Sequence, residues 1–399
     1  MMPPPERPYD VAIAGAGLAG ASLALALARG GAKVALLDPG TFPRDKLCGE
    51  FLSPECWGVL DRIGLAGAVE RSGYRPIRRV RLSTPAGRIL DAEIAGEDGS
   101  PGIGLGRSTL DNLLLAAARA EGVEVFEATR VGGPWVEDGR VAGLRARGAE
   151  AGEFAIRARV AVAADGRHSG LVKQAGTTRG RSWFRPRLFG LKRHLSVGEP
   201  GLDDGPGVVG LHLVPGGYGG TCRIEGTATN LCALLPESAV RARRGDLGRV
   251  AAECLGRNPR LARLLGGSTP AGEWKTVAGV RVQVSTPALP GLLFAGDAQG
   301  TVDPLGGQGM TMALLGAEAL APFVRRALAS PAGVDARLQA EVQAAWHRRF
   351  DRRVNLCRLF HHTLVRPAVV DLGAILGPLG SLLLSSGFRS TRDAEWSPA

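Results

Sequence analysis

A glycine-rich turn near the start of the chain limits the possible folds more than any other feature. The segment VAIAGAGLAGASLALALA begins at Val11 and carries its glycines in the pattern G-x-G-x-x-G. Its apolar start predicts a buried parallel strand, and the spacing of its Leu and Ala residues predicts a helix over 18–28. The next apolar run, KVALL, is followed by Asp38. This order of strand, turn, helix, strand and acid predicts a Rossmann-like dinucleotide site.

Each residue of this unit has a physical role in such a site. Gly15 allows the sharp turn from strand to helix, and Gly17 lets backbone N–H groups approach a pyrophosphate at the helix N-terminus. Gly20 lets the helix pack closely against the strand. Asp38 can accept hydrogen bonds from a ribose.

Bulk properties restrict the class of the protein and its partners. With 399 residues, 45% of them hydrophobic, the chain can bury a large core, which we expect to be divided between two joined lobes. The six cysteines lack a metal-binding spacing, so we expect reduced thiols and no metal. The net charge of +11 comes from dispersed Arg residues rather than basic runs, so we expect no nucleic acid partner. The N-terminal residues contain no apolar signal segment, which predicts a cytoplasmic location.

The order of patterns predicts an α/β (α+β) protein in which an antiparallel β-rich lobe is inserted into the Rossmann-like lobe. Alternating stretches follow Arg75 and again Phe184. Strand patterns at 160–165 and 291–298 return the chain to the first lobe. The predicted domains are a discontinuous dinucleotide-binding domain of 1–74, 106–180 and 276–330, a β-rich substrate domain of 75–105 and 181–275, and a C-terminal helical segment of 331–399.

The C-terminal segment from Leu364 to Phe388 is apolar enough to be considered as a membrane span. Asp371, several glycines and Pro378 interrupt it, so a buried or surface-lying helix pair is the better interpretation. Peripheral contact with a membrane remains open.

Three further motifs narrow the dinucleotide to one kind. Arg107 opens GRSTLD, Asp165 and Gly166 lie in AADGRHSGLVK, and Gly296 and Asp297 lie in LLFAGDAQGTVDPLGGQGMTMALLG. At these residues the chain resembles the FAD-dependent monooxygenases of the para-hydroxybenzoate hydroxylase type, with the related geranylgeranyl reductases and flavin halogenases. The resemblance spans roughly residues 9–320. It implies FAD as cofactor, a Rossmann-like FAD-binding domain, and NAD(P)H as a transient reductant.

The resemblance assigns roles to particular residues. Asp297 would bind the ribityl and pyrophosphate part of FAD, Arg107 its phosphates, and the segment at Asp165 both FAD and NAD(P)H. The residues expected to bind the cofactor are Gly15, Gly17, Ala19, Gly20, Asp38, Arg44, Lys46, Cys48, Gly49, Arg107, Val131, Asp165, Gly166, Gly296, Asp297, Pro304, Gly307, Gly309 and Met310.

The glycine-rich turn after Pro304 has a direct chemical rationale in a flavoprotein. Reduced flavin is anionic around N1 and O2, and backbone amides at the start of a helix near Gly309 could stabilise that charge. Gly306 and Gly307 would let the backbone reach the ring. We therefore place Pro304, Gly306 and Gly307, with Cys48, among the expected catalytic residues.

The segment KLCGEFLSP is similar to the K-x-C-G-(E/G/D) loop of geranylgeranyl reductase-like proteins, and PGGYGG is similar to their P-G-G-Y-G-W segment. Gly220 stands where that segment has Trp, which would reshape the cavity and puts a prenyl substrate in doubt. Cys48 could sit beside the flavin, although an isolated cysteine is more often a small buried hydrophobe. The expected substrate residues are Tyr218, Gly220, His212 and Arg223, of which His212, as a lone strand histidine, is more often structural.

The leading hypothesis is an FAD-dependent monooxygenase of secondary metabolism that hydroxylates or epoxidises a lipophilic or aromatic small molecule. NAD(P)H would reduce the flavin, and O2 would then form a flavin C4a-hydroperoxide. The alternative is an FAD-dependent ene-reductase similar to geranylgeranyl reductases, which reduces C=C bonds. A third hypothesis is a flavin-bound carrier without turnover. The sequence identifies neither the substrate nor the oligomeric state.

Overall fold

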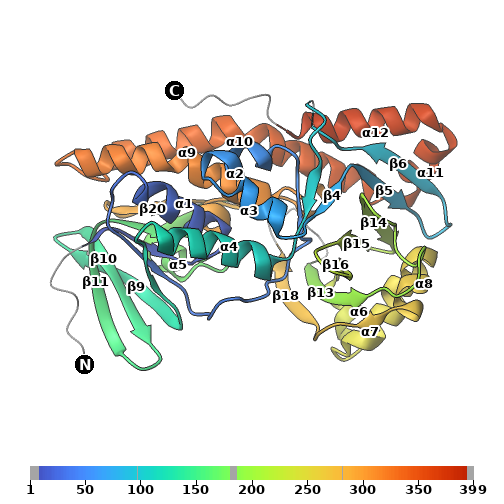
Figure 1. Cartoon of the computed structure of the whole chain (residues 1–399), viewed down its shortest axis with the longest axis horizontal. Helices are drawn as coiled ribbons and strands as arrows, with labels where there is room; N and C mark the ends of the chain where they lie inside the picture. The colour runs from blue at the N-terminus through green and yellow to red at the C-terminus, as the bar shows by residue number, and fades with distance from the viewer. Residues whose placement is uncertain (1–8, 97, 180–186, 281, 393–399) are drawn as a thin grey trace.

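Two β-sheets organise the structure, and both arise from the strand patterns of the sequence. The computed structural model describes residues 9–96, 98–179, 187–280 and 282–392 (Figure 1). The first sheet has the strand order β8-β2-β1-β11-β10-β9, and β20 pairs with β11. Its strands are β1 (Tyr9–Ala14), β2 (Val34–Leu37), β8 (Glu124–Phe126), β9 (Thr129–Glu137), β10 (Arg140–Gly148), β11 (Gly152–Ala163) and β20 (Leu292–Phe294).

The centre of the first sheet is parallel, as its apolar strands predict. β1 pairs in parallel with β2 and β11, β2 with β8, and β11 with β20, whereas β9, β10 and the start of β11 form an antiparallel meander. Helices pack around this sheet: α1 (Leu18–Ala28), α2 (Cys56–Arg62), α3 (Ala66–Arg71), α4 (Arg107–Ala120), α5 (Gly170–Ala175) and α9 (Gly309–Ala329). Helix α1 has almost no polar face, and nine of its 11 residues are buried because α4 and α9 also pack on it.

The second sheet has the order β17-β13-β16-β15-β14-β5-β6, and β18 pairs with β13. It is antiparallel except for the pairing of β14 with β5. Its strands are β5 (Arg79–Ser83), β6 (Ile89–Glu93), β13 (Leu188–Ser196), β14 (Val208–Val214), β15 (Gly217–Arg223), β16 (Ala228–Pro236), β17 (Thr269–Pro270) and β18 (Lys275–Val280). The helical elements after β16 are α6 (Glu237–Arg241), α7 (Leu247–Cys254), η1 (Leu255–Arg257) and α8 (Pro259–Gly267).

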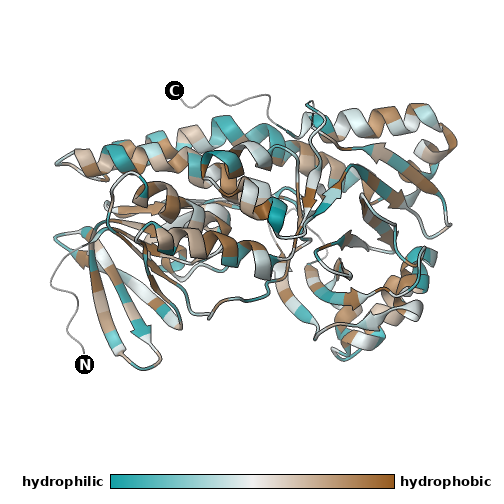
Figure 2. Ribbon diagram, viewed as in Figure 1, coloured by the Kyte–Doolittle hydropathy of each residue, from teal (hydrophilic) through white to brown (hydrophobic). Residues whose placement is uncertain are grey.

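Side chains alternate between the two faces of this second sheet. Leu191 and Leu231 belong to the hydrophobic cluster that the sheet forms with helices α7 and α8. Leu188, Tyr218 and Leu234 belong to a different cluster, on the face that looks toward the first lobe. We call these the helix-covered face and the inner face. Figure 2 shows brown, hydrophobic residues on both sheets and on the helices around them.

Short elements and the C-terminal helices join the two lobes. The short elements are β3 (Phe51–Leu52), β4 (Arg75–Ile77), β7 (Gly102–Gly104), β12 (Gly176–Arg179), β19 (Val284–Pro287), η2 (Gly296–Ala298) and η3 (Pro304–Gly306). The C-terminal helices are α10 (Ala336–Leu364), α11 (Pro367–Ile375) and α12 (Pro378–Ser390). Helix α10 packs on α9, and α11 and α12 pack on β6 at the far end of the second sheet (Figure 1).

The predicted fold class is confirmed: a Rossmann-like lobe carries an inserted, largely antiparallel sheet, and helices follow. The predicted domain boundaries stay predictions, and the one at 180–181, like the ends 1–8 and 393–399, lies outside the described residues. The segment 364–388 forms the expected helix pair. Within the described residues, no helix combines the length and the apolar character that crossing a bilayer requires.

Candidate functional site

The glycine turn between β1 and α1 has the geometry that its sequence predicts. Gly15 adopts a φ of +104°, in a region that side chains rarely allow. A Cβ on Gly20 would lie 1.8 Å from the Gly15 carbonyl oxygen, so only glycine permits this packing. Asp38 follows β2, and its Oδ2 accepts hydrogen bonds from the Ala16 N–H at 2.9 Å and from Arg44 at 2.7 Å. The turn and the acidic side chain are therefore held together.

Two cations converge on the space above this turn. A Cβ on Gly17 would meet only the Arg107 guanidinium at 3.8 Å and Lys46 Nζ at 3.9 Å. Arg107 begins α4 and is fixed by two hydrogen bonds of 2.8 Å to Asp111. Desolvation and then repulsion from Arg107 lower the pKa of Lys46, which has no acidic partner within salt-bridge distance among the described residues. An anion such as a pyrophosphate would relieve that repulsion.

A second glycine turn, before α9, also borders the site. Asp303 caps η3 by accepting the Leu305 N–H at 2.9 Å, and Gly307 has a φ of +65°. Helix α9 then begins at Gly309, as predicted, with its first backbone N–H groups directed along the helix axis. The ring of Phe51 would lie 3.0 Å from a Cβ on Gly307, so glycine keeps this turn close to its neighbour.

A buried group of charges fixes the loop that contains Cys48. Glu50, in a left-handed conformation with a φ of +57°, accepts hydrogen bonds from Lys192 Nζ at 2.7 Å and from the Arg107 N–H at 2.8 Å. Lys192 also contacts Asp45 at 2.5 Å, and His194 Nε2 lies 2.7 Å from the second oxygen of Glu50. Within the described residues, Asp45, Glu50 and His194 are the one group whose ligand atoms lie close enough together to hold a metal ion. The Lys192 ammonium contacts both carboxylates of this group. Sequence reasoning missed Glu50 and Lys192, although the Glu in CGEF was a usable signal.

One cavity joins the two glycine turns and continues along the inner face of the second sheet. Its empty volume, including the part open to solvent, is about 1660 Å³. Most of the predicted site residues line it. They are Gly17, Ala19, Lys46, Cys48, Gly49, Arg107, Gly166, Tyr218, Gly220, Gly296, Asp297, Pro304, Gly306, Gly307, Gly309 and Met310.

Six predicted cofactor residues do not line this cavity. Gly15, Gly20 and Asp38 shape the turn behind it, and Arg44 is bound to Asp38. Asp165 accepts the Gly170 N–H with one carboxylate oxygen, while its other oxygen is buried and has no hydrogen-bond partner among the described residues. The sixth residue, Val131, is half-buried on β9 and packs against the core of the meander.

The part of the cavity beyond the two glycine turns, along the second sheet, is lined by aliphatic and aromatic side chains. These come from several elements and were missed by sequence reasoning: Phe51, Val80, Ile94, Val209, Leu211, Leu234, Val277, Val280, Leu305 and Phe388. Arg392 is the charged side chain beside Phe388, and its guanidinium donates to the backbone carbonyl oxygens of Ile94 and Ala95, whereas Tyr218 and Cys232 are neutral. Burial raises the pKa of Cys232 to about 12 and that of Tyr218 well above its ordinary value. This half of the cavity therefore suits an apolar molecule.

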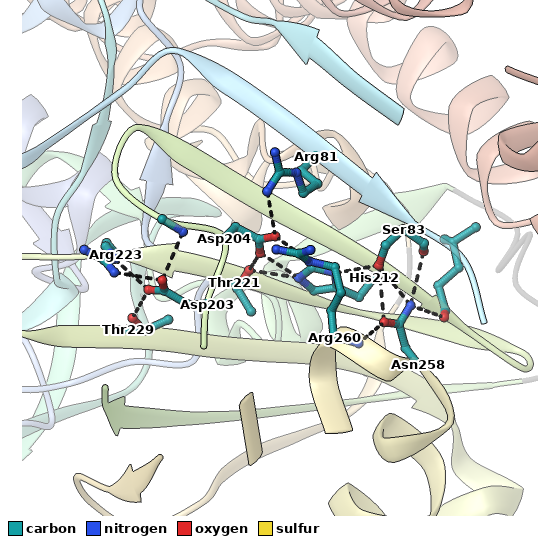
Figure 3. Close-up of polar contacts among 12 residues, drawn as sticks. Arg81, Ser83, Asp203, Asp204, His212, Thr221, Arg223, Thr229, Asn258 and Arg260 are labelled. Carbon is teal, nitrogen blue, oxygen red and sulfur yellow. Dashed lines mark hydrogen bonds and ion pairs between the residues drawn. The ribbon is translucent and has the colours of Figure 1, made fainter. Parts of the chain in front are cut away.

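The structure does not bring His212 and Arg223, two of the predicted substrate residues, to the cavity. His212 is buried on the helix-covered face, where its Nε2 lies 2.9 Å from Asp204 (Figure 3). Arg223 forms two hydrogen bonds with Asp203, at 2.6 and 2.8 Å. Neither lines the cavity. Because side chains alternate along a strand, Tyr218 and Gly220 face inward while Arg223, an odd number of residues away, faces outward.

The residues around His212 form a Ser, His and Asp chain that has no access to substrate. Ser83 Oγ lies 2.8 Å from His212 Nδ1, and Asn258 is hydrogen-bonded to the same Ser83 (Figure 3). Ser83, His212 and Asn258 are almost completely buried. A hydrolytic nucleophile needs an exposed oxygen, so we interpret this chain as a structural network between β5, β14 and α8.

Comparisons with known proteins agree with this geometry. Residues 8–189 match the FAD binding domain family model. Digeranylgeranylglycerophospholipid reductase 1 of Methanopyrus kandleri is 28% identical over 77% of this chain and 78% of its own. Conditioned medium factor receptor 1 of Dictyostelium discoideum is also 28% identical, over 78% of this chain but 62% of its own length. The structure of the flavin-dependent brominase Bmp2 has the same fold, with a TM-score of 0.78, 18% identity and coverage of 96% and 93% of the two chains.

The fold and the cavity, with this family match, define an FAD-dependent oxidoreductase. The residues fit the cofactor, because a glycine turn bounded by two cations and a helix N-terminus line the same cavity. More particularly, the match to the FAD binding domain and the Methanopyrus kandleri relative support the resemblance to FAD-dependent monooxygenases and geranylgeranyl reductase-like flavoproteins that the motifs predicted.

Proposed function

We propose that the protein is an FAD-dependent monooxygenase that hydroxylates or epoxidises a lipophilic or aromatic small molecule, with NAD(P)H as reductant and O2 as oxidant. The observation that carries this proposal is the continuity of the cavity. The cofactor-binding turns and the aliphatic surfaces of the second lobe line the same space. A lipophilic molecule bound there would be next to the flavin ring and out of bulk water.

In this proposal the protein binds, orients and excludes water. Bound FAD would supply the redox chemistry, by accepting a hydride from NAD(P)H and delivering electrons to O2. Arg107 and Lys46 would hold its phosphates, and the N–H groups at the start of α9 would stabilise negative charge on the reduced ring. Tyr218 and Cys232, which are neutral, would form part of the wall around the substrate and would not supply an anionic base.

Small residues leave room for a flat ring on the sheet side of the cavity. Gly220 pairs with Cys232 across β15 and β16. A Cβ on Gly220 would meet only two backbone oxygens, those of Cys232 at 3.5 Å and Gly210 at 3.7 Å. The absence of a bulky side chain there supports a substrate with a flat head, and the aliphatic lining supports an alkyl chain attached to it.

The proposal is tested with isotopically labelled O2. Purified protein is incubated with NAD(P)H and a series of alkyl-substituted phenols, and the products are analysed by mass spectrometry. We expect a product that has gained one labelled oxygen atom. Products that contain only unlabelled oxygen or none would contradict monooxygenation.

The second candidate function is reduction of a C=C bond in an isoprenoid lipid. The aliphatic lining of the cavity favours it, and the relative from Methanopyrus kandleri is named as a reductase of digeranylgeranylglycerophospholipids. The same protein would then convert an isoprenoid substrate without O2, when NAD(P)H or dithionite is the reductant. A mass increase of two hydrogen atoms under anaerobic conditions would support this candidate over the first.

A further inference from the structure

Exposed hydrophobic side chains are concentrated on the helix pair α11–α12. Within the described residues, ten large hydrophobic side chains are exposed, and seven of them lie between Val369 and Leu383. Ile375 is 64% exposed and Leu383 is 60% exposed, on either side of the turn that joins the helices. Monomeric proteins rarely expose so many large apolar groups together without a partner.

The opposite side of this helix pair is firmly packed, so the exposed leucines are not the surface of a loose tail. Val370 and Phe388 are buried against β6 and its neighbours. A Cβ on Gly380 would lie 2.0 Å from the Gly373 carbonyl oxygen, so the two helices cross in close contact. Ser385 Oγ also accepts the Glu93 N–H at 3.0 Å. The pair is therefore an amphipathic unit with one fixed and one exposed side.

The exposed charged side chains at the two ends of this unit are arginines. Residues 366–389, which span the helix pair and the residue before it, contain two arginines and one acid, Asp371. Asp371 is engaged, because its Oδ1 accepts a hydrogen bond from Thr84 at 2.8 Å and lies 3.8 Å from Arg88. Arg366 before α11 and Arg389 at the end of α12 are exposed. Apolar side chains flanked by exposed arginines complement an anionic lipid surface.

The same helix pair borders the cavity. Phe388 of α12 and Arg392 after it line the cavity, while Leu379 and Leu383 of α12 face solvent. The Arg392 guanidinium donates hydrogen bonds to the carbonyl oxygens of Ile94 at 2.6 Å and Ala95 at 2.9 Å, which ties the end of α12 to the cavity wall. One element thus connects the exposed apolar surface with the apolar interior.

We propose that α11–α12 docks the protein on the surface of an anionic bilayer, with the leucines around the turn in the lipid and Arg366 and Arg389 at the headgroups. A lipophilic substrate would then pass from the bilayer along α12 into the cavity. The docking step rests only on the surface of the helix pair. The transfer of substrate rests on the proposed function.

Docking is tested by co-sedimentation with lipid vesicles. One set contains phosphatidylcholine alone and the other contains phosphatidylcholine and phosphatidylglycerol in equal parts. We expect the wild-type protein to sediment with the anionic vesicles and to be released by high salt. The double variant Leu379→Asp, Leu382→Asp should bind the anionic vesicles at least about tenfold more weakly than the wild-type protein, because charged side chains do not enter the lipid.

The control is Val136→Asp, which introduces one aspartate at a side chain 43% exposed on β9, away from the helix pair. It should bind vesicles like the wild-type protein. Loss of vesicle binding in both the double variant and Val136→Asp would overturn the proposal. Failure of the wild-type protein to bind the anionic vesicles would overturn it as well. A wild-type dimer in sedimentation velocity that Leu379→Asp, Leu382→Asp converts to monomer would overturn it too, because the surface would then hold a second copy of the chain.

Flavin absorbance distinguishes this proposal from the proposed function. The double variant should retain FAD and its reduction by NAD(P)H, since the substituted leucines are exposed and do not line the cavity. Vesicle binding without any monooxygenation or reduction would leave docking intact and contradict only the assigned reaction.

Discussion

Lys192 Nζ lies 2.7 Å from Glu50 Oε1, and neither side chain has any exposed surface. Their partners lie at the phosphate end of the site, because Glu50 also accepts the Arg107 N–H at 2.8 Å and Lys192 donates to the Lys46 carbonyl oxygen at 3.1 Å. This ion pair links the second sheet to the loop and the helix that face the cofactor space. It therefore positions the backbone that carries Arg107 and Lys46.

Substituting Lys192→Met should lower the free energy of unfolding by about 3–5 kcal/mol, because it leaves Glu50 buried without its cation. FAD should also be retained less well, since Arg107 and Lys46 lose a common support. Denaturant unfolding and flavin fluorescence measure the two effects. The double variant Lys192→Met, Glu50→Gln should recover part of the stability.

The control for this prediction is Lys275→Met. Lys275 lies 4.0 Å from Asp45, but its side chain is 44% exposed, so its loss should cost about 1 kcal/mol or less. Equal losses in Lys192→Met and Lys275→Met would mean that the buried pair has no special importance.

Arg107→Lys tests the phosphate end of the site. Lysine keeps the charge but cannot form the two hydrogen bonds with Asp111, so the cation would no longer be held above Gly17. We expect the Kd for FAD to rise about tenfold or more, which corresponds to about 1.4 kcal/mol. Isothermal titration of the apoprotein gives the value. Arg119→Lys on the exposed side of the same helix should leave it unchanged, and an unaltered Kd in Arg107→Lys would remove Arg107 from the cofactor site.

Gly220→Trp tests the space above the second sheet. The side chain would extend into the cavity, since only backbone oxygens lie near a Cβ at this position. Turnover of a ring-bearing substrate should fall about tenfold or more, because the lost volume changes which molecules fit. Reduction of bound FAD by NAD(P)H should be unaffected. Gly220→Ala, which adds a single methyl group, should retain most activity, and equal activity in Gly220→Trp would place the substrate elsewhere.

The polar network of Figure 3 predicts a pH dependence of stability. Burial by itself would raise the pKa of Asp204, but hydrogen bonds from His212 and Thr221 and the charge of Arg260 hold that pKa well below its ordinary value. A carboxyl group with a lowered folded-state pKa stabilises the fold above its unfolded pKa of about 3.9, and the contribution is lost as pH falls toward the folded pKa. Asp204→Asn should therefore lower the unfolding free energy by about 3 kcal/mol at pH 7.

That difference between Asp204→Asn and the wild-type protein should shrink as the pH is lowered below about 4. Urea unfolding followed by circular dichroism at a series of pH values measures it. Asp91→Asn is the matched control, because Asp91 pairs with Arg81 beside the same network but has a side chain 33% exposed. A loss for Asp204→Asn that is constant at every pH would contradict the account of its charge.

The sequence predicted the parts of the structure that short-range patterns determine. The turn at Gly15 and Gly17, the helix over 18–28 and the helix start at Gly309 follow from glycine conformations and apolar spacing within a few residues. These are also the parts on which the family resemblance rests. The fold class followed from the order of such patterns.

The other parts of the site depend on contacts between residues far apart in the sequence, or on which face of a strand a side chain occupies. Lys192 and Glu50 are 142 positions apart, so no local pattern pairs them. His212 and Arg223 were predicted as substrate residues, and both lie on strands of the second sheet. A strand has two faces, however, and the face was not determined without knowledge of which residues α7 and α8 cover.

The central claim is that O2 is a substrate of the reaction in this cavity. An oxygen electrode, combined with NAD(P)H absorbance and product analysis, tests it most directly for any lipophilic compound that the protein converts. The account predicts that the compound stimulates O2 consumption, and that O2, NAD(P)H and product change in equal amounts. Product formed at the same rate with and without O2 would contradict monooxygenation and identify the reaction as a reduction of the substrate.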